Sequence, residues 1–231
     1  MSQTIRVGLI GAGYIASWHA DALRATEGVT LSAVCDVSLG AAQSLADGFG
    51  GRAFASVEEL IDSGTCDAVH ILTPPHLHHD IAVQCLQGGL HVLVEKPVAE
   101  SADQTRAIEA AAQAAGKRFH AGHNFLAMPS YLRLKDMLTR GELGRVSSAE
   151  IAWAFPLAPL RSGPYGLWLL REPKNLLLEL GPHLMAFAVD LFGTPEIAVP
   201  KEYLPPELQK ALELEPIVLP AWDPMGSLAD E

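Results

Sequence analysis

The sequence is poor in cysteine, in aromatic residues and in positive charge. Only 3 of its 231 residues are cysteine, and Phe, Trp and Tyr together make up 6%. Cys35, Cys66 and Cys85 form no CxxC pair. Neither a disulfide framework nor a zinc site is therefore indicated, and a reducing, cytoplasmic compartment is expected. With 27 acidic and 16 basic residues the formal net charge is −11, which argues against binding to nucleic acids or anionic membranes.

Long uninterrupted apolar runs are also missing. The longest apolar stretch, residues 176–192, contains Glu179, His183 and Asp190, whereas a membrane span needs about 18 or more apolar residues. The first residues lack a charged segment followed by an apolar one, so no signal peptide is predicted and a soluble protein is expected. The composition, 49% hydrophobic and 19% charged, is typical of a globular chain with its own core.

As far as residue 121, short apolar runs alternate with alanine-rich segments of helical character. Such alternation requires helical crossovers between parallel strands. It predicts an α/β fold in which residues 1–121 form a doubly wound parallel sheet. Capping boxes at 56–59 and 101–104 mark two helix starts. The expected strands are 6–10, 31–35, 53–55, 68–72, 91–94 and 118–121.

After Gly122 the alternation stops, and residues 122–198 predict a smaller, partial α+β domain with an incomplete, mainly antiparallel sheet. Its expected elements are a helix, a strand and an apolar helical segment that ends at Phe192, with Pro182 in a first helical turn because proline lacks an N–H. Residues 199–231 form a proline-rich tail that permits one short helix. The open edge of a single strand favours homo-oligomers. The expected helix, strand and tail helix span 129–140, 146–155 and 206–214.

A glycine-rich turn follows the first expected strand. Gly11-Ala-Gly13-Tyr14-Ile15-Ala fits the GxGxxA pattern, in which Gly11 permits a tight turn and Gly13 lets the backbone approach a pyrophosphate at a helix N-terminus. Asp36, 25 residues after Gly11, is expected to accept hydrogen bonds from a ribose. Because no arginine follows Asp36, NAD is favoured over NADP. A turn with a packing role only is the alternative.

Two later segments are more specific. They are Thr73-Pro74-Pro-His-Leu-His78 and Glu95-Lys96-Pro, and the pattern continues through Gly122-His123-Asn124 and the segment 190–193. Together with the glycine turn and Asp36, they resemble the glucose–fructose oxidoreductase/inositol dehydrogenase (Gfo/Idh/MocA) family over about residues 4–198. The resemblance implies a Rossmann domain and an NAD-dependent oxidoreductase. Its hydride would pass between nicotinamide and a hydroxyl or carbonyl carbon of a sugar, sugar derivative or cyclitol.

The resemblance also implies roles for individual residues. Lys96 matches the family's lysine beside the nicotinamide, and Glu179 and His183 match its acid–histidine pair, so these three are the candidate catalytic residues. Lys96 and His183, together with His123 and Asn124, are the candidate substrate-binding residues. A solvated lysine, a core histidine and a packing role for 123–124 are the respective alternatives. The candidate cofactor residues are Gly11, Gly13, Tyr14, Ile15, Asp36, Thr73, Pro74, His78, Glu95 and Lys96.

Departures from the family pattern support a second hypothesis. Glu179 replaces an aspartate, Ala186 stands where many relatives carry an acid, and only 38 residues follow Gly193, where relatives continue with several strands. A non-catalytic or truncated NAD-binding subunit for binding or assembly is therefore the alternative, and a redox-assisted cleavage of glycosides is a third. No acid or cysteine at ligand spacing accompanies the histidines of 76–79, so no metal is predicted.

Overall fold

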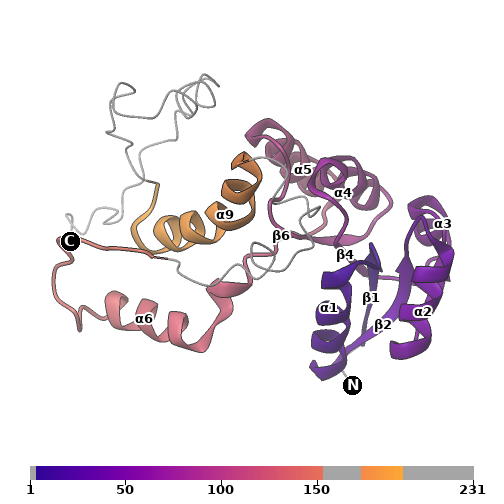
Figure 1. Ribbon diagram of the computed structural model, residues 1–231, viewed down its shortest axis with the longest axis horizontal. Coiled ribbons are helices and arrows are strands. Elements are labelled where there is room, and N and C mark those ends of the chain that lie inside the picture. Colours follow the sequence, from indigo (N-terminus) through magenta and orange to yellow (C-terminus); the bar gives the residue numbers. More distant parts are fainter. Residues whose placement is uncertain (1–3, 153–172, 195–231) are drawn as a thin grey trace. The chain divides into compact units, whose positions relative to one another are not determined.

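The computed structural model describes residues 4–152 and 173–194. The chain divides into two compact units, with the boundary between His123 and Asn124 (Figure 1). The strands of the described residues all belong to the first unit, and each overlaps a strand predicted from the sequence. They are β1 (Ile5–Ile10), β2 (Val29–Cys35), β3 (Arg52–Phe54), β4 (Ala68–Ile71), β5 (His91–Val94) and β6 (Phe119–Ala121).

The six strands form one sheet in the order β3-β2-β1-β4-β5-β6, and every neighbouring pair is parallel. Leu9 in β1 pairs with Val34 on one side and with His70 on the other. The chain order reverses between β1 and β4, so the connections after these two strands leave toward opposite faces. In open parallel sheets, ligands bind at such a reversal, beyond the carboxyl ends of the strands.

Helices cover both faces of the sheet. Leu9 and Val34 pack with Ala20 of α1 and Ala46 of α2 in one buried cluster. The second cluster contains residues of α3, α4 and α5. Both faces of the central strands are therefore apolar, as in other doubly wound folds. The helices are α1 (Tyr14–Ala25), α2 (Leu39–Phe49), α3 (Val57–Asp62), α4 (His78–Gln87), which follows the short 3-10 helix η1 (Pro75–Leu77), and α5 (Ala102–Ala115).

Both predicted capping boxes are present in modified form. The Ser56 hydroxyl accepts a hydrogen bond from the Glu59 N–H at 3.1 Å, and Ser101 does the same for Gln104 at 3.2 Å. The return bond reaches the residue before the cap, since the Glu59 carboxylate accepts from the Ala55 N–H at 3.3 Å. These bonds satisfy amides that a helix start leaves without partners. They thereby fix the loops that precede α3 and α5.

In the second unit, side-chain bonds join two helices. The unit contains η2 (Asn124–Ala127), α6 (Pro129–Thr139) and α9 (Pro173–Phe192). The buried Tyr131 hydroxyl donates to the Asp190 carboxylate, and the Lys135 ammonium lies 2.8 Å from the same group. Burial and the bond to Asp190 raise the pKa of Tyr131. The Lys135 and Tyr131 bonds lower the pKa of Asp190, so α6 is tied to an ionised carboxylate on α9.

Two expectations for the second unit need correction. Residues 146–152, the described part of the strand predicted over 146–155, are not in a strand. A strand is stabilised by pairing with a neighbour, and the described residues of this unit contain no other strand.

Pro182 lies inside α9 rather than in a first turn. Its missing N–H leaves the Leu178 carbonyl without an intrahelical donor, and Leu178 is 40% exposed, so water can supply that bond. The predicted tail helix, 206–214, lies outside the described residues.

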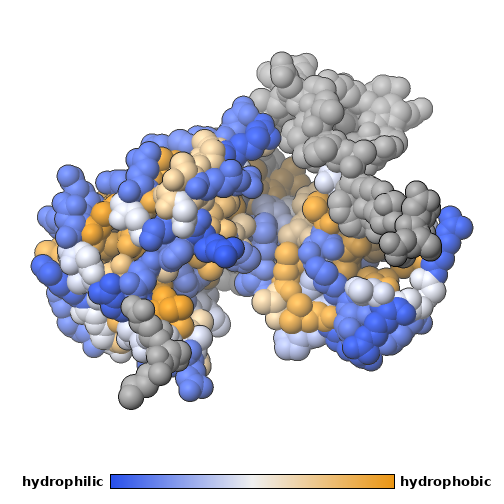
Figure 2. Space-filling model, turned by 180° about the vertical axis from the view of Figure 1, so that it is seen from behind, coloured by the Kyte–Doolittle hydropathy of each residue, from blue (hydrophilic) through white to orange (hydrophobic). Residues whose placement is uncertain are grey.

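Apolar side chains remain exposed on both helices of the second unit. Figure 2 shows apolar surface on this part of the molecule beside hydrophilic surface. Among the described residues, no helix is both long enough and apolar enough to cross a membrane. The exposed apolar residues of α6 and α9 are Leu132, Leu134, Leu177, Leu178, Met185, Val189 and Phe192.

Candidate functional site

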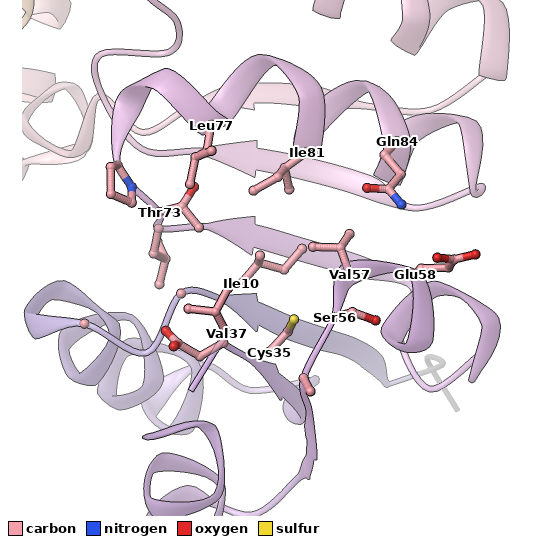
Figure 3. Close-up of a pocket in the computed structure, with 16 residues that line it drawn as sticks. Ile10, Cys35, Val37, Ser56, Val57, Glu58, Thr73, Leu77, Ile81 and Gln84 are labelled. Atoms are coloured by element: carbon pink, nitrogen blue, oxygen red, sulfur yellow. The ribbon is translucent and has the colours of Figure 1, made fainter. Parts of the chain in front are cut away.

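A cleft of ≈ 520 Å³ lies at the carboxyl edge of the sheet. In Figure 3, Leu77, Ile81 and Gln84 extend from α4 and its preceding turn toward Ile10 and Val37 on the opposite wall. The walls are mainly apolar, with polar groups at intervals, as is usual for cofactor sites. The lining residues are Ile10, Gly11, Gly13, Cys35, Asp36, Val37, Ala55, Ser56, Val57, Glu58, Leu72, Thr73, Pro74, Leu77, Ile81 and Gln84.

The two glycines of the turn differ in whether the fold itself could accommodate a side chain at their positions. Gly11 has a φ of 101°, and a Cβ there would lie 2.9 Å from the Leu72 carbonyl carbon, so only glycine fits. Gly13 has an ordinary φ of −78°, and a Cβ built on it meets nothing within 4 Å. The protein itself therefore does not require glycine at position 13. The space beside it is open to the cleft, at the N-terminus of α1, where backbone N–H groups favour phosphate.

Asp36 follows β2 and holds two loops together. Its Oδ2 accepts the Ala12 N–H and its Oδ1 accepts the Ser38 N–H, both at 2.8 Å. Each carboxylate oxygen has a second lone pair, so both can accept a further hydrogen bond. Neighbouring Val37 is 99% exposed. The site therefore offers a fixed anionic acceptor at the rim of the cleft, with no cation at the next two positions.

Thr73 lines the same cleft at the end of β4. Its Oγ1 is buried and makes no hydrogen bond within the described residues. A buried hydroxyl without a partner is uncommon in folded proteins and calls for one. Thr73 Oγ1, the open space at Gly13 and the remaining lone pairs of Asp36 are groups with which a bound dinucleotide could interact.

Pro74 also lines the cleft, whereas the remaining predicted cofactor residues lie away from the lining. Tyr14 is 84% exposed in the first turn of α1, with Ile15 beside it. His78 is buried, and its ring lies between two carbonyl oxygens, 2.7 Å from that of Thr73 and 2.9 Å from that of Pro97. His78 thus links the loop after β4 to the loop after β5. It positions the cleft wall and the Glu-Lys-Pro segment without lining the cleft itself.

Glu95 begins the Glu-Lys-Pro loop directly after β5. Its Oε1 lies 3.0 Å from His19 Nε2, and its Oε2 accepts the Lys96 N–H at 3.1 Å. His19 Nδ1 lies 3.0 Å from His70 Nδ1. Burial acts to raise the pKa of the Glu95 carboxyl, but the His19 bond, the His19 charge and the Lys96 N–H together lower it. The carboxylate beside Lys96 is therefore ionised and held by two partners.

His123 lies close to this loop, directly after β6. Burial is the main reason that its pKa is lowered, and the charge of His120 lowers it further, whereas Glu95 opposes the shift. Its Nδ1 is buried and makes no hydrogen bond within the described residues. A Cβ at the preceding residue, Gly122, would lie 3.1 Å from Glu95 Oε1. A side chain at position 122 would therefore require Glu95 or the β5 backbone to shift by a few tenths of an ångström.

The remaining candidates belong to the second unit. Asn124 is exposed at the start of η2. Because α9 continues through Pro182, Glu179 and His183 are four residues apart on one helix and share a face. His183 is 7% exposed, and its ring packs edge-on against Phe125 with centroids 4.6 Å apart. The pair that the sequence left doubtful is thus placed on a continuous helix.

His19 and His70 were missed by the sequence analysis. One signal was available for His70, which interrupts the apolar strand Ala68-Val-His-Ile71. A polar side chain in a buried strand needs a hydrogen-bond partner. His19 lies on α1, and its partners are 51 and 76 residues away. No local pattern predicts such separations.

The described residues contain no group of three or more His, Cys, Asp or Glu side chains arranged to hold a metal. Among the histidines of 76–79, His79 pairs with the exposed Asp80 at 2.7 Å, and His78 is bound by backbone carbonyls. Burial raises the pKa of the Cys35 thiol, which lines the cleft, to about 11, so this cysteine remains a neutral thiol.

Curated relatives share sequence along most of the chain. A 1,5-anhydro-D-fructose reductase from Ensifer adhaerens is 32% identical over 77% of this chain and 54% of its own length. An inositol 2-dehydrogenase from Pseudarthrobacter chlorophenolicus is 34% identical over 63% and 44%. The chain therefore spans about half the length of these relatives.

Solved structures of oxidoreductases are also similar to this chain. GenD2 from gentamicin A biosynthesis, in complex with NAD, has a TM-score of 0.68 and 27% identity over 84% of this chain and 55% of its own. KijD10, a 3-ketoreductase from Actinomadura kijaniata in complex with NADP, has a TM-score of 0.56 and 30% identity over 60% and 43%. The profile of the oxidoreductase family with an NAD-binding Rossmann fold matches residues 5–123. On these grounds, the chain belongs to the Gfo/Idh/MocA family of oxidoreductases.

Proposed function

We propose that the protein is an NAD-dependent oxidoreductase that acts on a hydroxyl or carbonyl carbon of a sugar, sugar derivative or cyclitol. The observation that carries the proposal is the shared sheet edge. The cleft with Gly13, Asp36 and Thr73 and the anchored Glu95–Lys96 loop lie at the carboxyl ends of neighbouring strands. When bound, NAD supplies the hydride acceptor or donor. The protein contributes binding, orientation and proton transfer.

The cleft residues hold the dinucleotide in this proposal. The α1 N-terminus at Gly13 receives the pyrophosphate, and Thr73 Oγ1 gains a partner from the bound cofactor. The apolar walls formed by Val37, Leu77 and Ile81 suit the adenine ring. Asp36 accepts from the adenosine ribose through lone pairs that its two backbone bonds leave unused.

Asp36 is also the basis for preferring NAD to NADP. A 2′-phosphate would bring its negative charge beside the Asp36 carboxylate, and the two like charges would repel. Val37 and Ser38, the next two residues, offer no positive charge to offset this. Relatives bound to either cofactor are known, as GenD2 and KijD10 show, so the preference rests on this chain's own residues.

Lys96 is the proposed catalytic residue of the first unit. Its backbone is fixed by the bond to Glu95, which places its side chain at the β5 end of the sheet edge. The lysine ammonium is a hydrogen-bond donor that can exchange a proton with a substrate oxygen as the C–O bond order changes. His123, whose lowered pKa keeps it neutral, is proposed as a substrate contact through its Nδ1.

His183 is the proposed proton carrier of the second unit, with Glu179 one helical turn before it. The ring packed on Phe125 has limited freedom, which suits proton transfer in a fixed direction. Asn124, exposed at the start of η2, is proposed as a further substrate contact. A homo-oligomer is also proposed, in which a second copy of the chain covers the apolar surface of α6 and α9.

A substrate panel tests the proposal. The purified chain is assayed with NAD and myo-inositol, glucose 6-phosphate or methyl glucoside, and with NADH and 1,5-anhydro-D-fructose, by the absorbance of reduced nicotinamide. Turnover of at least one compound is expected. His183→Gln should reduce it by about 100-fold or more. His79→Gln, a histidine paired with a carboxylate on the surface, is the matched control and should match the wild type.

Two results would contradict the proposal at different levels. Tight NADH binding without turnover of any compound would remove the enzymatic reading and leave a nucleotide-binding subunit. Full activity of His183→Gln, with turnover otherwise present, would remove only the role of His183.

A further inference from the structure

Three ionisable side chains from three separate elements meet beneath the Glu-Lys-Pro loop. His19 comes from α1, His70 from β4 and Glu95 from the end of β5. His19 bonds to both of the others, at 3.0 Å in each case. The His19 and Glu95 side chains are 17% and 16% exposed. The row lies outside the dinucleotide cleft, since none of the three lines it.

Hydrogen-bond chemistry restricts where the protons of this row can lie. The ionised Glu95 carboxylate can only accept, so His19 Nε2 carries a hydrogen. If His19 is neutral, its Nδ1 is an acceptor and His70 Nδ1 must donate. If His19 is protonated, its Nδ1 donates and His70 Nδ1 must accept, so the hydrogen of His70 then sits on Nε2. Both arrangements fit the same two distances.

Passing from one arrangement to the other adds one proton to the row and moves another. The incoming proton binds His70 Nε2, and the proton on His70 Nδ1 passes to His19 Nδ1. His70 is neutral before and after the step. The net charge of the row changes from −1 to zero. The heavy atoms keep their places, so the row responds to pH without rearrangement of the fold.

The surrounding charges favour His19, rather than His70, as the site of the added proton. Burial, followed by the charge of His19, lowers the pKa of His70 to about 4. His19 instead faces the Glu95 carboxylate directly. The other charged or titratable groups near Glu95 are Lys96, next to it in the chain, and His123, which lies beside His120.

The second oxygen of Glu95 connects this row to Lys96. Oε1 faces His19, while Oε2 accepts the Lys96 N–H. A change of charge on His19 therefore acts on the carboxylate that fixes the Lys96 backbone. A rotation of Glu95 would break both bonds together.

We propose that His19, His70 and Glu95 form a proton-sharing relay that fixes the position of Lys96 and sets the charge beside it, with His19 as a positioning residue. The connection to turnover rests on the proposed catalytic role of Lys96. The proton sharing itself does not depend on that role and can be measured in the protein without turnover.

The direct test is nitrogen-15 NMR of the full chain labelled at histidine, with His19→Gln and His70→Asn used to assign the two rings. At alkaline pH, His70 should be the Nδ1–H tautomer. When the row takes up a proton on acidification, His70 should switch to the Nε2–H tautomer and remain neutral. A His70 ring that keeps one tautomer across the whole pH range would overturn the relay.

Kinetics tests the connection to Lys96. His70→Asn keeps a hydrogen-bond donor toward His19 but removes the ring that takes up a proton and passes one to His19, so the acid limb of the kcat profile should move to lower pH by about one unit. His19→Gln keeps a donor toward Glu95 but removes Nδ1, and should lower kcat by about 10-fold without changing the KM for NAD. His79→Gln should change neither profile.

The possible outcomes separate the two proposals. A wild type without turnover that still shows the tautomer switch contradicts the catalytic proposal and supports the relay. A wild type with turnover, but with an unchanged pH profile in His70→Asn, overturns the link between relay and Lys96.

Discussion

The carboxylates of Asp36 and Glu95 both lie at the carboxyl edge of the sheet, one in each half, but their hydrogen-bond partners differ. Asp36, after β2, accepts only from backbone N–H groups, of Ala12 and Ser38. Glu95, after β5, accepts from one backbone N–H and pairs with His19. Backbone amides do not titrate near neutral pH, whereas imidazole does. One half of the edge therefore keeps a constant charge, and the other can change its charge with pH.

This difference matches the two roles in the proposed function, which are cofactor binding at the Asp36 half and proton transfer at the Glu95 half. Binding a cofactor needs a rigid acceptor, and Asp36 is braced by two loops. Proton transfer needs groups that can exchange protons. Lys96 lies beside Glu95 and His123, and Glu95 pairs with His19. Substitutions at the Asp36 half should therefore change binding, and those at the Glu95 half should change turnover or its pH dependence.

The largest effect is expected for Lys96→Ala. Loss of the proton-exchanging group should lower kcat by about 100- to 10,000-fold. The affinity for NADH, measured by calorimetric titration, should remain within about threefold, because the cleft at the Asp36 half is untouched. A variant with wild-type turnover would contradict the role of Lys96 and the functional contrast between the two halves.

Asp36→Ala should produce the opposite pattern. It removes charge-assisted bonds to the ribose, each worth about 1.5–3 kcal/mol, so NADH affinity should fall by about 10- to 100-fold, measured by the same titration. NADPH affinity should fall less or rise, because the repulsion is removed. An unchanged ratio of NADH to NADPH affinity would exclude Asp36 from the ribose site.

The two glycines of the turn offer a smaller, paired test. Gly13→Ala adds a methyl group that meets no protein atom within 4 Å. The free energy of unfolding, measured by thermal unfolding, should therefore change by about 1 kcal/mol or less. The NADH affinity should fall by about 10-fold, because the methyl group occupies the space proposed for the phosphates. Gly11→Ala should instead destabilise the fold, through its φ of 101° and the Leu72 contact. Equal NADH affinity in Gly13→Ala and the wild type would place the pyrophosphate elsewhere.

Stability should also depend on pH through the Glu95 half. The pKa of His70 is lowered to about 4 in the folded protein, against about 6.5 in an unfolded chain. Between these values the unfolded state binds more protons, so the free energy of unfolding falls as pH drops from about 6.5 to about 4, by on the order of 2 kcal/mol. Urea unfolding at several pH values should show this slope, and His70→Asn should reduce it. An equal slope in both proteins would mean that His70 is solvated as in the unfolded chain.

The sequence predicted the first unit well because its signals are local. Apolar runs of strand length, capping residues such as Ser56 and Ser101, and a glycine turn before a helix each act over a few residues. The six strands were accordingly located to within a residue or two, and the Asp36 position followed from the strand that precedes it.

Long-range pairing and tertiary context explain what the sequence did not predict. His19 and Glu95 meet across 76 residues, and His78 links two loops through their carbonyls, a structural role that no local pattern indicated. Pro182 continues a helix because loss of one backbone bond is tolerated where Leu178 is exposed to water. The apolar pattern of 146–155 predicted a strand, but strand formation depends on a pairing partner that local pattern does not reveal.

Calorimetric titration of the full chain with NADH and with NADPH tests the central claim most directly. The role of the cleft as the nucleotide site and the role of Asp36 as the ribose acceptor both require nucleotide binding. We predict saturable binding of NADH, and weaker binding of NADPH by about 10-fold or more, as expected for repulsion from Asp36. Failure to bind either nucleotide, or tighter binding of NADPH, would contradict the account.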